Sequence, residues 1–219
     1  MNFSTVNQKQ EELIKNGYIV INLGNNETEK QQDIEMITEI EAKLLREEME
    51  LRHRNETIKG QKHLFVLYET EDLMSMTKLV IKKAEVREMM TRYLGTEELD
   101  IQQQIFWRNP GGLPIPPHQD RVYENDRHLS IVIPMTSITK NSGALMYKKT
   151  SEETAYKHYY SFKLNQFCAI VGNGEYKLPY DQNDIVIHTY NNMHMAIRPT
   201  MTQKRGVYIR LVIKKYQVQ

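Results

Sequence analysis

The run Leu129-Ser130-Ile131-Val132-Ile133-Pro134-Met135 is short, apolar and rich in β-branched residues, which is typical of a strand buried in a sheet. Similar runs lie on both sides of it, separated by turn signals such as Asn109-Pro110-Gly111-Gly112 and Gly172-Asn173-Gly174. The expected strands are Ile101–Arg108, Leu129–Met135, Ala144–Tyr147, Gln166–Val171, Ile185–Thr189 and Gly206–Lys214. Many short strands with regular turns predict an antiparallel sandwich or barrel over about residues 96–216.

The first 95 or so residues have a different pattern and are predicted to be mainly helical. Helical spacing of apolar residues predicts helices over Gln8–Lys15, Thr28–Leu51 and Glu71–Leu94, and Tyr18–Ile21 has the pattern of a short strand. The residues of the third helix expected to face inward are Leu73, Met76, Val80, Ala84 and Met90. We therefore predict one α+β domain over residues 1–219, with the helices packed on the outside of the β-sandwich.

The composition is that of an ordinary globular protein, with 219 residues, 29 Lys+Arg against 28 Asp+Glu and a formal net charge of +1. This balance disfavours a dedicated partner such as nucleic acid or an anionic membrane, which usually requires a basic excess. The single cysteine, Cys168, excludes an internal disulfide and is expected to be a small buried residue. We expect a cytoplasmic protein without a secretory or membrane-spanning segment that acts on a small molecule.

The stretch Pro116-Pro117-His118-Gln119-Asp120 indicates a metal site. In an extended segment, residues two apart point to the same side, so His118 and Asp120 can aim at one point. His194, just after the expected strand Ile185–Thr189, is the best candidate for a third ligand. Two imidazoles and one carboxylate on one face of an ion leave three adjacent positions open, as expected of non-haem Fe(II) oxygenases. An isolated histidine near an aspartate also fits a surface pair, but its place after a Pro/Gly-rich loop within the sandwich favours the metal site.

The order of these motifs resembles the phytanoyl-CoA dioxygenase-like family of Fe(II)/2-oxoglutarate-dependent oxygenases. Arg108–Gly112 and the following Pro116–Asp120 resemble the family's K-x-P-G-G and W-H-Q-D motifs. Thr136–Leu145 resembles its stretch ending in N-G-x-L. Asn183–His188 and the later His194 resemble its G-D-x-x-x-F motif and distal histidine. The resemblance covers most of the chain and implies a double-stranded β-helix (jelly-roll, cupin-like) core.

The resemblance also implies roles for residues. His118, Asp120 and His194 would hold Fe(II), with 2-oxoglutarate and O2 in the open positions. Arg205, eleven positions after the distal histidine, would bind the far carboxylate of 2-oxoglutarate. Gln104 would add a hydrogen bond to 2-oxoglutarate from inside the barrel.

Three further residues compete for these roles. Arg198 and Arg210 are rivals of Arg205, although Arg198 follows His194 closely and Arg210 lies on the opposite strand face from Arg205. His188 competes with His194 for the metal, but it stands where the family has an aromatic residue. We therefore favour His188 as a neighbouring imidazole rather than a ligand.

The implied activity is hydroxylation of an unactivated C–H bond of a small metabolite, with release of succinate and CO2. In related halogenases a small residue replaces the carboxylate, so Asp120 favours hydroxylation, while desaturation or cyclisation stays open. Trp107, Arg121, Tyr123 and Arg198 are expected near the mouth of the site and are the predicted substrate contacts. An amino acid or a natural-product intermediate is the expected substrate by family analogy.

Two alternatives remain open. A cupin-like metal enzyme that does not use 2-oxoglutarate would keep the three ligands and make Arg205 dispensable. A non-catalytic small-molecule-binding barrel is less favoured, because binding alone does not require three intact ligands. The chain also differs from the family pattern at Pro117, Asn183 and Ala196, and these changes affect the expected contacts around 2-oxoglutarate rather than the metal ligands.

Overall fold

The fold is that of a computed structural model of the chain. The residues that the structure describes are 3–22, 27–45, 55–57, 63–67, 77–78, 80–81, 83–108, 114–120, 127–135, 138, 143–150, 157–161, 166–170, 176–178, 184–198, 200 and 206–215.

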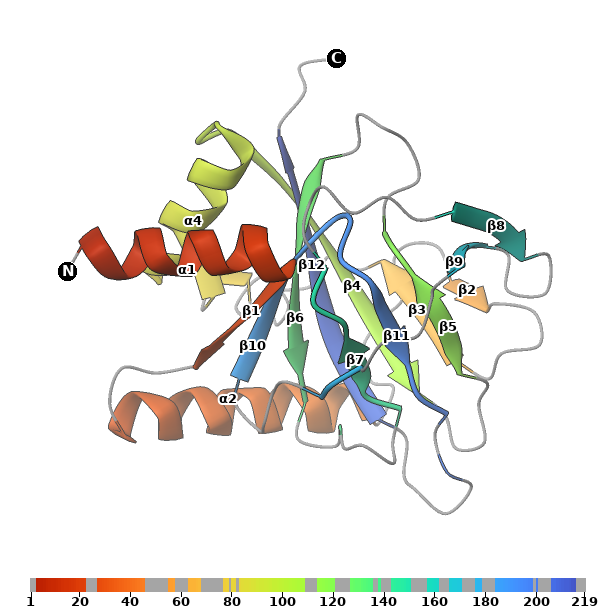
Figure 1. The fold of residues 1–219 in the computed structure, drawn as a ribbon. Coiled ribbons are helices and arrows are strands. Elements are labelled where there is room, and N and C mark those ends of the chain that lie inside the picture. The colour runs from red at the N-terminus through yellow and green to blue at the C-terminus, as the bar shows by residue number, and fades with distance from the viewer. Residues whose placement is uncertain are drawn as a thin grey trace.

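A seven-stranded antiparallel sheet forms the centre of the protein (Figure 1). Its strands, in spatial order, are β1 (Tyr18–Asn22), β10 (Asp184–Thr189), β6 (His128–Pro134), β12 (Gly206–Lys215), β4 (Leu99–Arg108), β3 (His63–Leu67) and β2 (Asn55–Thr57). β12 and β4 pair over ten residues, so the long C-terminal strand lies in the middle of the sheet between β6 and β4. β6 and β10, whose side chains are almost all buried, also lie inside the sheet.

A smaller antiparallel sheet faces one side of the large sheet. It consists of β5 (Ile115–His118), β11 (His194–Ala196) and β7 (Leu145–Tyr147), with β11 in the middle. Buried apolar side chains of both sheets, such as Leu145, Val132 and Tyr208, form one cluster between them. A separate hairpin pairs β8 (Lys157–Ser161) with β9 (Gln166–Ile170).

Within the described part of the chain, three long helices cover the other side of the large sheet (Figure 1). They are α1 (Phe3–Asn16), α2 (Glu27–Leu45) and α4 (Ala84–Leu94). The helices contribute Leu13, Ile37 and Met89 to a larger apolar cluster with Ile131 and Ile209 of the sheet. Because side chains alternate along a strand, each strand presents one set of residues to the helices and the other set to the small sheet. None of the helices in the described part of the chain is long and apolar enough to cross a membrane.

The predicted combination of outer helices and antiparallel sheets is confirmed, but the predicted helix over 71–94 is wrong as a continuous element. The backbone at Lys83 is extended, with φ −66° and ψ 109°, and α4 begins after it at Ala84. Val80 and Met90 are buried as predicted, but the break changes the helical phase, so Ala84 is exposed and Val86 and Met89 are buried. Residues 68–76, including Leu73 and Met76, lie outside the described residues.

The N-terminal part of the chain supplies more of the sheet than its helical pattern predicted. Besides the expected strand at β1, residues 55–57 and 63–67 form β2 and β3 at the opposite edge. Strand β5 falls in the stretch that the sequence predicts as extended, without predicting a strand there. Pro116 and Pro117 cannot donate to a sheet, and the position of β5 at the edge of the small sheet accommodates them. Cys168 lies on β9, and its side chain is outside the described part.

Candidate metal centre

His118 and His194 are neighbours across the small sheet. β5 pairs with β11 so that His118 stands directly opposite His194, and the two ring centroids are 4.3 Å apart. Directly opposed residues of an antiparallel pair share one face, so the pairing alone directs both imidazoles to the same side. The register shifts immediately after His194, which is a local irregularity of the kind often found beside functional sites.

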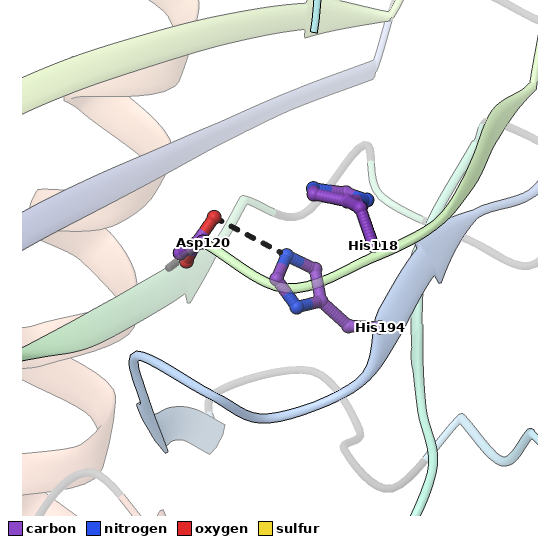
Figure 2. A group of neighbouring side chains, drawn as sticks. All are labelled: His118, Asp120 and His194. Carbon is purple, nitrogen blue, oxygen red and sulfur yellow. Dashed lines mark ion pairs between the residues drawn. The ribbon is translucent and has the colours of Figure 1, made fainter. Parts of the chain in front are cut away.

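Asp120 completes a group of three side chains that point toward one another (Figure 2). Their candidate ligand atoms all lie within 4.8 Å of one another. Asp120 Oδ1 is 3.7 Å from His194 Nε2. The three residues come from sequence positions up to 76 apart, so the pairing of β5 with β11 is what brings them together.

The hydrogen bonds of both imidazoles leave one nitrogen of each available. His118 Nδ1 lies 2.9 Å from the carbonyl oxygen of Pro116, and His194 Nδ1 lies 3.2 Å from that of Asn192. A carbonyl oxygen only accepts, so in each contact Nδ1 carries the hydrogen and donates it. The lone pair then sits on Nε2, which is the usual arrangement for a metal-binding histidine.

The protonation states also suit a metal. Burial lowers the pKa of His118 and lowers the pKa of His194 well below its usual value, so both imidazoles are neutral near pH 7. Burial would raise the pKa of Asp120, but the neighbouring Arg210 guanidinium opposes it and holds that pKa well below its usual value. Two neutral imidazoles and one ionised carboxylate are ready to bind a divalent ion without losing protons.

Three more polar side chains surround Asp120 Oδ2. Arg210 Nη2 donates to it at 2.6 Å and Ser130 Oγ donates to it at 3.3 Å. His188 Nδ1 lies 3.9 Å from the same oxygen, and burial lowers the pKa of His188 to about 3. His188 is thus a neutral imidazole beside the carboxylate, and the metal-binding group found among the described residues does not include it. This placement agrees with its interpretation as a neighbour rather than a ligand.

The turn before His194 is fixed by the N-terminal segment. The backbone N–H of Thr189 donates to the carbonyl oxygen of Gly17 at 2.9 Å, and the backbone N–H of Thr150 donates to the carbonyl oxygen of Asn16 at 2.8 Å. The side-chain amide of Asn192 donates to the backbone carbonyl oxygen of Lys148 at 3.0 Å. The junction of α1 and β1 is therefore in direct contact with the loop that carries the third candidate ligand.

The predicted cofactor contact Gln104 lies on the same face of the sheet as Arg210. The two residues are paired across β4 and β12, and Gln104 is buried. Its Oε1 has no hydrogen-bond partner within the described part of the chain. A buried amide oxygen without a partner costs free energy, so this position fits a ligand that can donate a hydrogen bond inside the site.

For the other predicted site residues, the described part of the chain shows no contact with the three candidate ligands. Arg205, Arg121 and Tyr123 lie outside the described residues, and so does the side chain of Trp107, whose backbone belongs to β4. Arg198 follows β11 and is exposed. The roles assigned to these five residues stay predictions.

The family resemblance favours Arg205 over Arg210, whereas the structure places Arg210 beside the triad. Strand alternation puts Arg210 on the face opposite Arg205. The observed register puts Arg210 on the face of β12 that also carries Tyr208, toward the small sheet. The available signal was a lone charge inside the apolar run Val207–Ile213, because a buried charge requires a partner.

No family model matches the sequence, and no curated protein matches it. Solved structures do resemble it. EvdO2 from Micromonospora carbonacea var. aurantiaca, complexed with 2-oxoglutarate, has 18% identity and a TM-score of 0.62 over 96% of this chain and 92% of that chain. A Pseudomonas putida prolyl-4-hydroxylase has 11% identity and a TM-score of 0.60 over 97% of this chain and 100% of that one.

The epimerase SnoN, in complex with Fe3+, alpha ketoglutarate and nogalamycin RO, has 10% identity and a TM-score of 0.61 over 98% of this chain and 85% of that one. At such identities the similarity concerns the fold, which this chain shares with structures of the 2OG-Fe(II) oxygenase family. The ligands that these structures hold agree with the predicted iron and 2-oxoglutarate. The resemblance to the phytanoyl-CoA dioxygenase-like group in particular stays a prediction.

Proposed function

We propose that this chain is a non-haem Fe(II)- and 2-oxoglutarate-dependent dioxygenase. In this proposal it hydroxylates an unactivated C–H bond of a small metabolite, an amino acid or a natural-product intermediate, and releases succinate and CO2. The observation that carries the proposal is the convergence of two neutral imidazoles and one ionised carboxylate between the two sheets. This donor set suits Fe(II) and leaves adjacent positions for other ligands.

In this proposal each group of residues has its own role in binding iron and 2-oxoglutarate. His118, Asp120 and His194 hold the iron, and Gln104 donates or accepts a hydrogen bond at 2-oxoglutarate. Arg205 binds the far carboxylate, since a guanidinium matches a carboxylate and stays charged in a desolvated site. When bound, iron and 2-oxoglutarate supply the activation of O2 and the oxidation of the substrate. The protein orients both reactants and excludes water between the two sheets.

The same proposal covers the architecture. We assign the two facing sheets to a double-stranded β-helix and the whole chain, residues 1–219, to one oxygenase domain in the cytoplasm. We assign Trp107, Arg121, Tyr123 and Arg198 to the substrate side of the site. The structural neighbours include an epimerase and a carbocyclase, so the reaction outcome has to be measured and not taken from the fold.

The first experiment tests the cofactors without a substrate. Anaerobic protein is titrated with Fe(II) and then with 2-oxoglutarate, and the visible metal-to-ligand charge-transfer band is recorded. We expect a band that is absent in His118→Ala and weakened in Arg205→Ala. Lys204→Ala is the control, since it removes the neighbouring positive charge and should leave the band unchanged. A folded wild-type protein without a band would refute the use of 2-oxoglutarate and favour a cupin-like metal enzyme.

The second experiment tests the reaction. Amino acids and natural-product intermediates are screened for succinate release that is matched by consumption of the added compound. The product is then formed under ¹⁸O2. Hydroxylation places one labelled oxygen in succinate and the other in the product, whereas epimerisation, desaturation or ring closure leaves the product unlabelled. An unlabelled product would replace the hydroxylase assignment while keeping the oxygenase mechanism.

A further inference from the structure

The two oxygens of the Asp120 carboxylate have different surroundings. Oδ1 faces His194 Nε2 at 3.7 Å, on the side where His118 also lies. Oδ2 faces the opposite way and accepts hydrogen bonds from Arg210 Nη2 at 2.6 Å and from Ser130 Oγ at 3.3 Å. The carboxylate side chain is 9% exposed, so these contacts take the place of water.

We infer that Arg210 and Ser130 are positioning residues that hold Asp120 through Oδ2, so that Oδ1 alone is presented to the metal. The inference rests on the proposed metal-binding role of Asp120. It does not depend on which cosubstrate or substrate the site uses.

The register of the large sheet places Arg210 and Ser130 next to the same oxygen, Asp120 Oδ2. Arg210 on β12 pairs with Val132 on β6, and Val212 pairs with Ser130, so Arg210 and Ser130 are diagonal neighbours on one face. Asp120 follows β5, which belongs to the small sheet. The ion pair therefore links the two sheets beside the metal-binding group.

The hydrogen bonds have a consistent direction. Arg210 Nε and Nη2 donate to Ser130 Oγ at 3.0 Å and 2.8 Å, and a guanidinium has no acceptor. Ser130 Oγ accepts from Arg210, and its own hydrogen points to Asp120 Oδ2. Rotation of the carboxylate to bring Oδ2 to the ion would break the bonds from both donors. A lysine has one compact ammonium group and cannot reproduce the contacts that the Nε and Nη2 atoms of Arg210 make with Ser130 and Asp120.

This arrangement has two consequences for the site. A carboxylate that offered both oxygens would fill one more position at the ion, whereas one that is held through Oδ2 leaves that position for another ligand. The guanidinium also balances the Asp120 charge, and an imidazole that binds a metal through its lone pair is neutral, so a bound divalent ion leaves a net charge of about +2. That charge favours a dianionic ligand that binds through two atoms over a monoanion that binds through one.

The test uses Co(II) as the probe, in the absence of O2 and substrate, with full-length wild-type protein, Arg210→Met, Arg210→Lys and Ser130→Ala. Lys215→Met is the matched control, since it removes an exposed cation from the same strand. Affinity is measured by competition with a chelator, coordination by the visible spectrum of bound Co(II), and folding by circular dichroism. Binding of 2-oxoglutarate is then compared with binding of azide.

For Arg210→Met we expect Co(II) affinity to fall about 10- to 100-fold, with a changed spectrum and a greater loss of 2-oxoglutarate binding than of azide binding. Arg210→Lys should recover only part of the affinity, and Ser130→Ala should lose less than Arg210→Met. Should Arg210→Met fail to fold, Arg210→Lys and Ser130→Ala decide the matter through the Co(II) spectrum. The Lys215→Met protein should match the wild type.

Wild-type Co(II) affinity and spectrum in folded Arg210 and Ser130 variants would overturn the inference. So would a loss of 2-oxoglutarate binding alone, because Arg210 would then act on the ligand and not through Asp120. Absence of Co(II) binding in the wild type would overturn both the inference and the proposed function. Co(II) effects as expected without a 2-oxoglutarate band would support the inference and refute the proposed cosubstrate.

Discussion

Along strand β12, Ile209, Leu211 and Ile213 point toward the helices, while Tyr208 and Arg210 point toward the small sheet. The neighbouring strands alternate in the same way. The helix-facing residues of β6 and β10 belong to the large apolar cluster, and they are Leu129, Ile131, Ile133, Ile185 and Ile187. The residues between them include Ser130 and His188, which surround Asp120.

The face of the sheet that packs against the helices contributes mainly to stability, and the face toward the small sheet carries the candidate site. Burial of apolar groups on the helix face contributes stability in proportion to the area removed from water. Burial of polar groups on the other face costs free energy unless each group finds a partner. Arg210, Ser130 and Asp120 are hydrogen-bonded to one another. The side-chain oxygen of Gln104 has no hydrogen-bond partner among the described residues. Such a face is expected of a site whose remaining partner is a ligand.

The largest expected effect is on the helix face. Ile131→Ala removes a fully buried side chain from the large cluster and should lower the free energy of unfolding by about 2–5 kcal/mol. Ile131→Val is the graded control, with an expected loss of about 0.5–1.5 kcal/mol. Denaturant unfolding gives the stability, and Co(II) titration below the transition gives the affinity, which should not change. A marked drop in affinity of the folded variant would mean that the two faces are not separable.

The sequence predicted the apolar face of the sheet well. Runs such as Leu129–Met135 and Ile185–Thr189 carry their own strand signal, and their positions match β6 and β10 closely. The break in the helix at Lys83 was less predictable. Val80 and Val86 are both buried yet six residues apart, which does not fit one face of a continuous helix, and only the structure shows that the chain breaks between them.

The polar face was predictable only in part. The motif at His118 and Asp120 and the position of His194 indicated which side chains meet, because local strand geometry and chain order carry that information. The face of β12 that lines the site depends on the packing of the two sheets, and strand alternation alone does not give it. Arg210 was therefore set aside, and its ion pair with Asp120 is a tertiary contact between residues 90 positions apart.

Gly17 offers a test of how the polar face is held in place. Its φ is +76°, and a Cβ there would lie 2.3 Å from the carbonyl oxygen of Thr150 and 2.7 Å from Asn192 Nδ2. Gly17→Ala should therefore lower the free energy of unfolding by about 1–3 kcal/mol, through backbone strain and the clash. It should also weaken Co(II) binding, because Asn192 belongs to the turn that carries His194.

Gly95→Ala is the matched control for this substitution. Gly95 ends α4 with a φ of +70°, and a Cβ there would meet nothing within 4 Å. The control carries the conformational cost alone, about 1 kcal/mol. Equal losses of stability and unchanged metal affinity in the two variants would show that the Gly17 contact does not position His194.

His188 gives the polar face a specific pH dependence. Its pKa is about 3 in the folded protein and about 6.5 when unperturbed, so below pH 6.5 the unfolded chain takes up a proton that the folded protein excludes. Stability is therefore fully present above pH 6.5 and is lost as the pH falls toward 3, by about 1.4 kcal/mol per pH unit. His118 and His194 add to this slope in the metal-free protein.

His188→Phe should make that slope shallower by about one proton, or about 1.4 kcal/mol per pH unit, between pH 6 and 4.5. Urea unfolding of the metal-free variant and wild type at several pH values measures it. His128→Phe is a comparison variant, because His128 is also buried but packs against Tyr190 at the start of β6. A slope that is unchanged in His188→Phe would show that this imidazole is not held neutral beside Asp120.

The smallest effect is expected where a polar pair lies on the apolar face. Gln103 donates to Thr77 Oγ1 at 2.7 Å, and its register opposite Leu211 places it on the helix side of β4. Replacing both partners with apolar residues of similar shape removes a partly buried pair without leaving either group unpaired. Thr77→Val with Gln103→Leu should therefore change the free energy of unfolding by less than about 1 kcal/mol, while each single variant should cost more. A large loss in the double variant, measured by the same denaturant unfolding, would mean that polar contacts are as essential on this face as they are around Asp120.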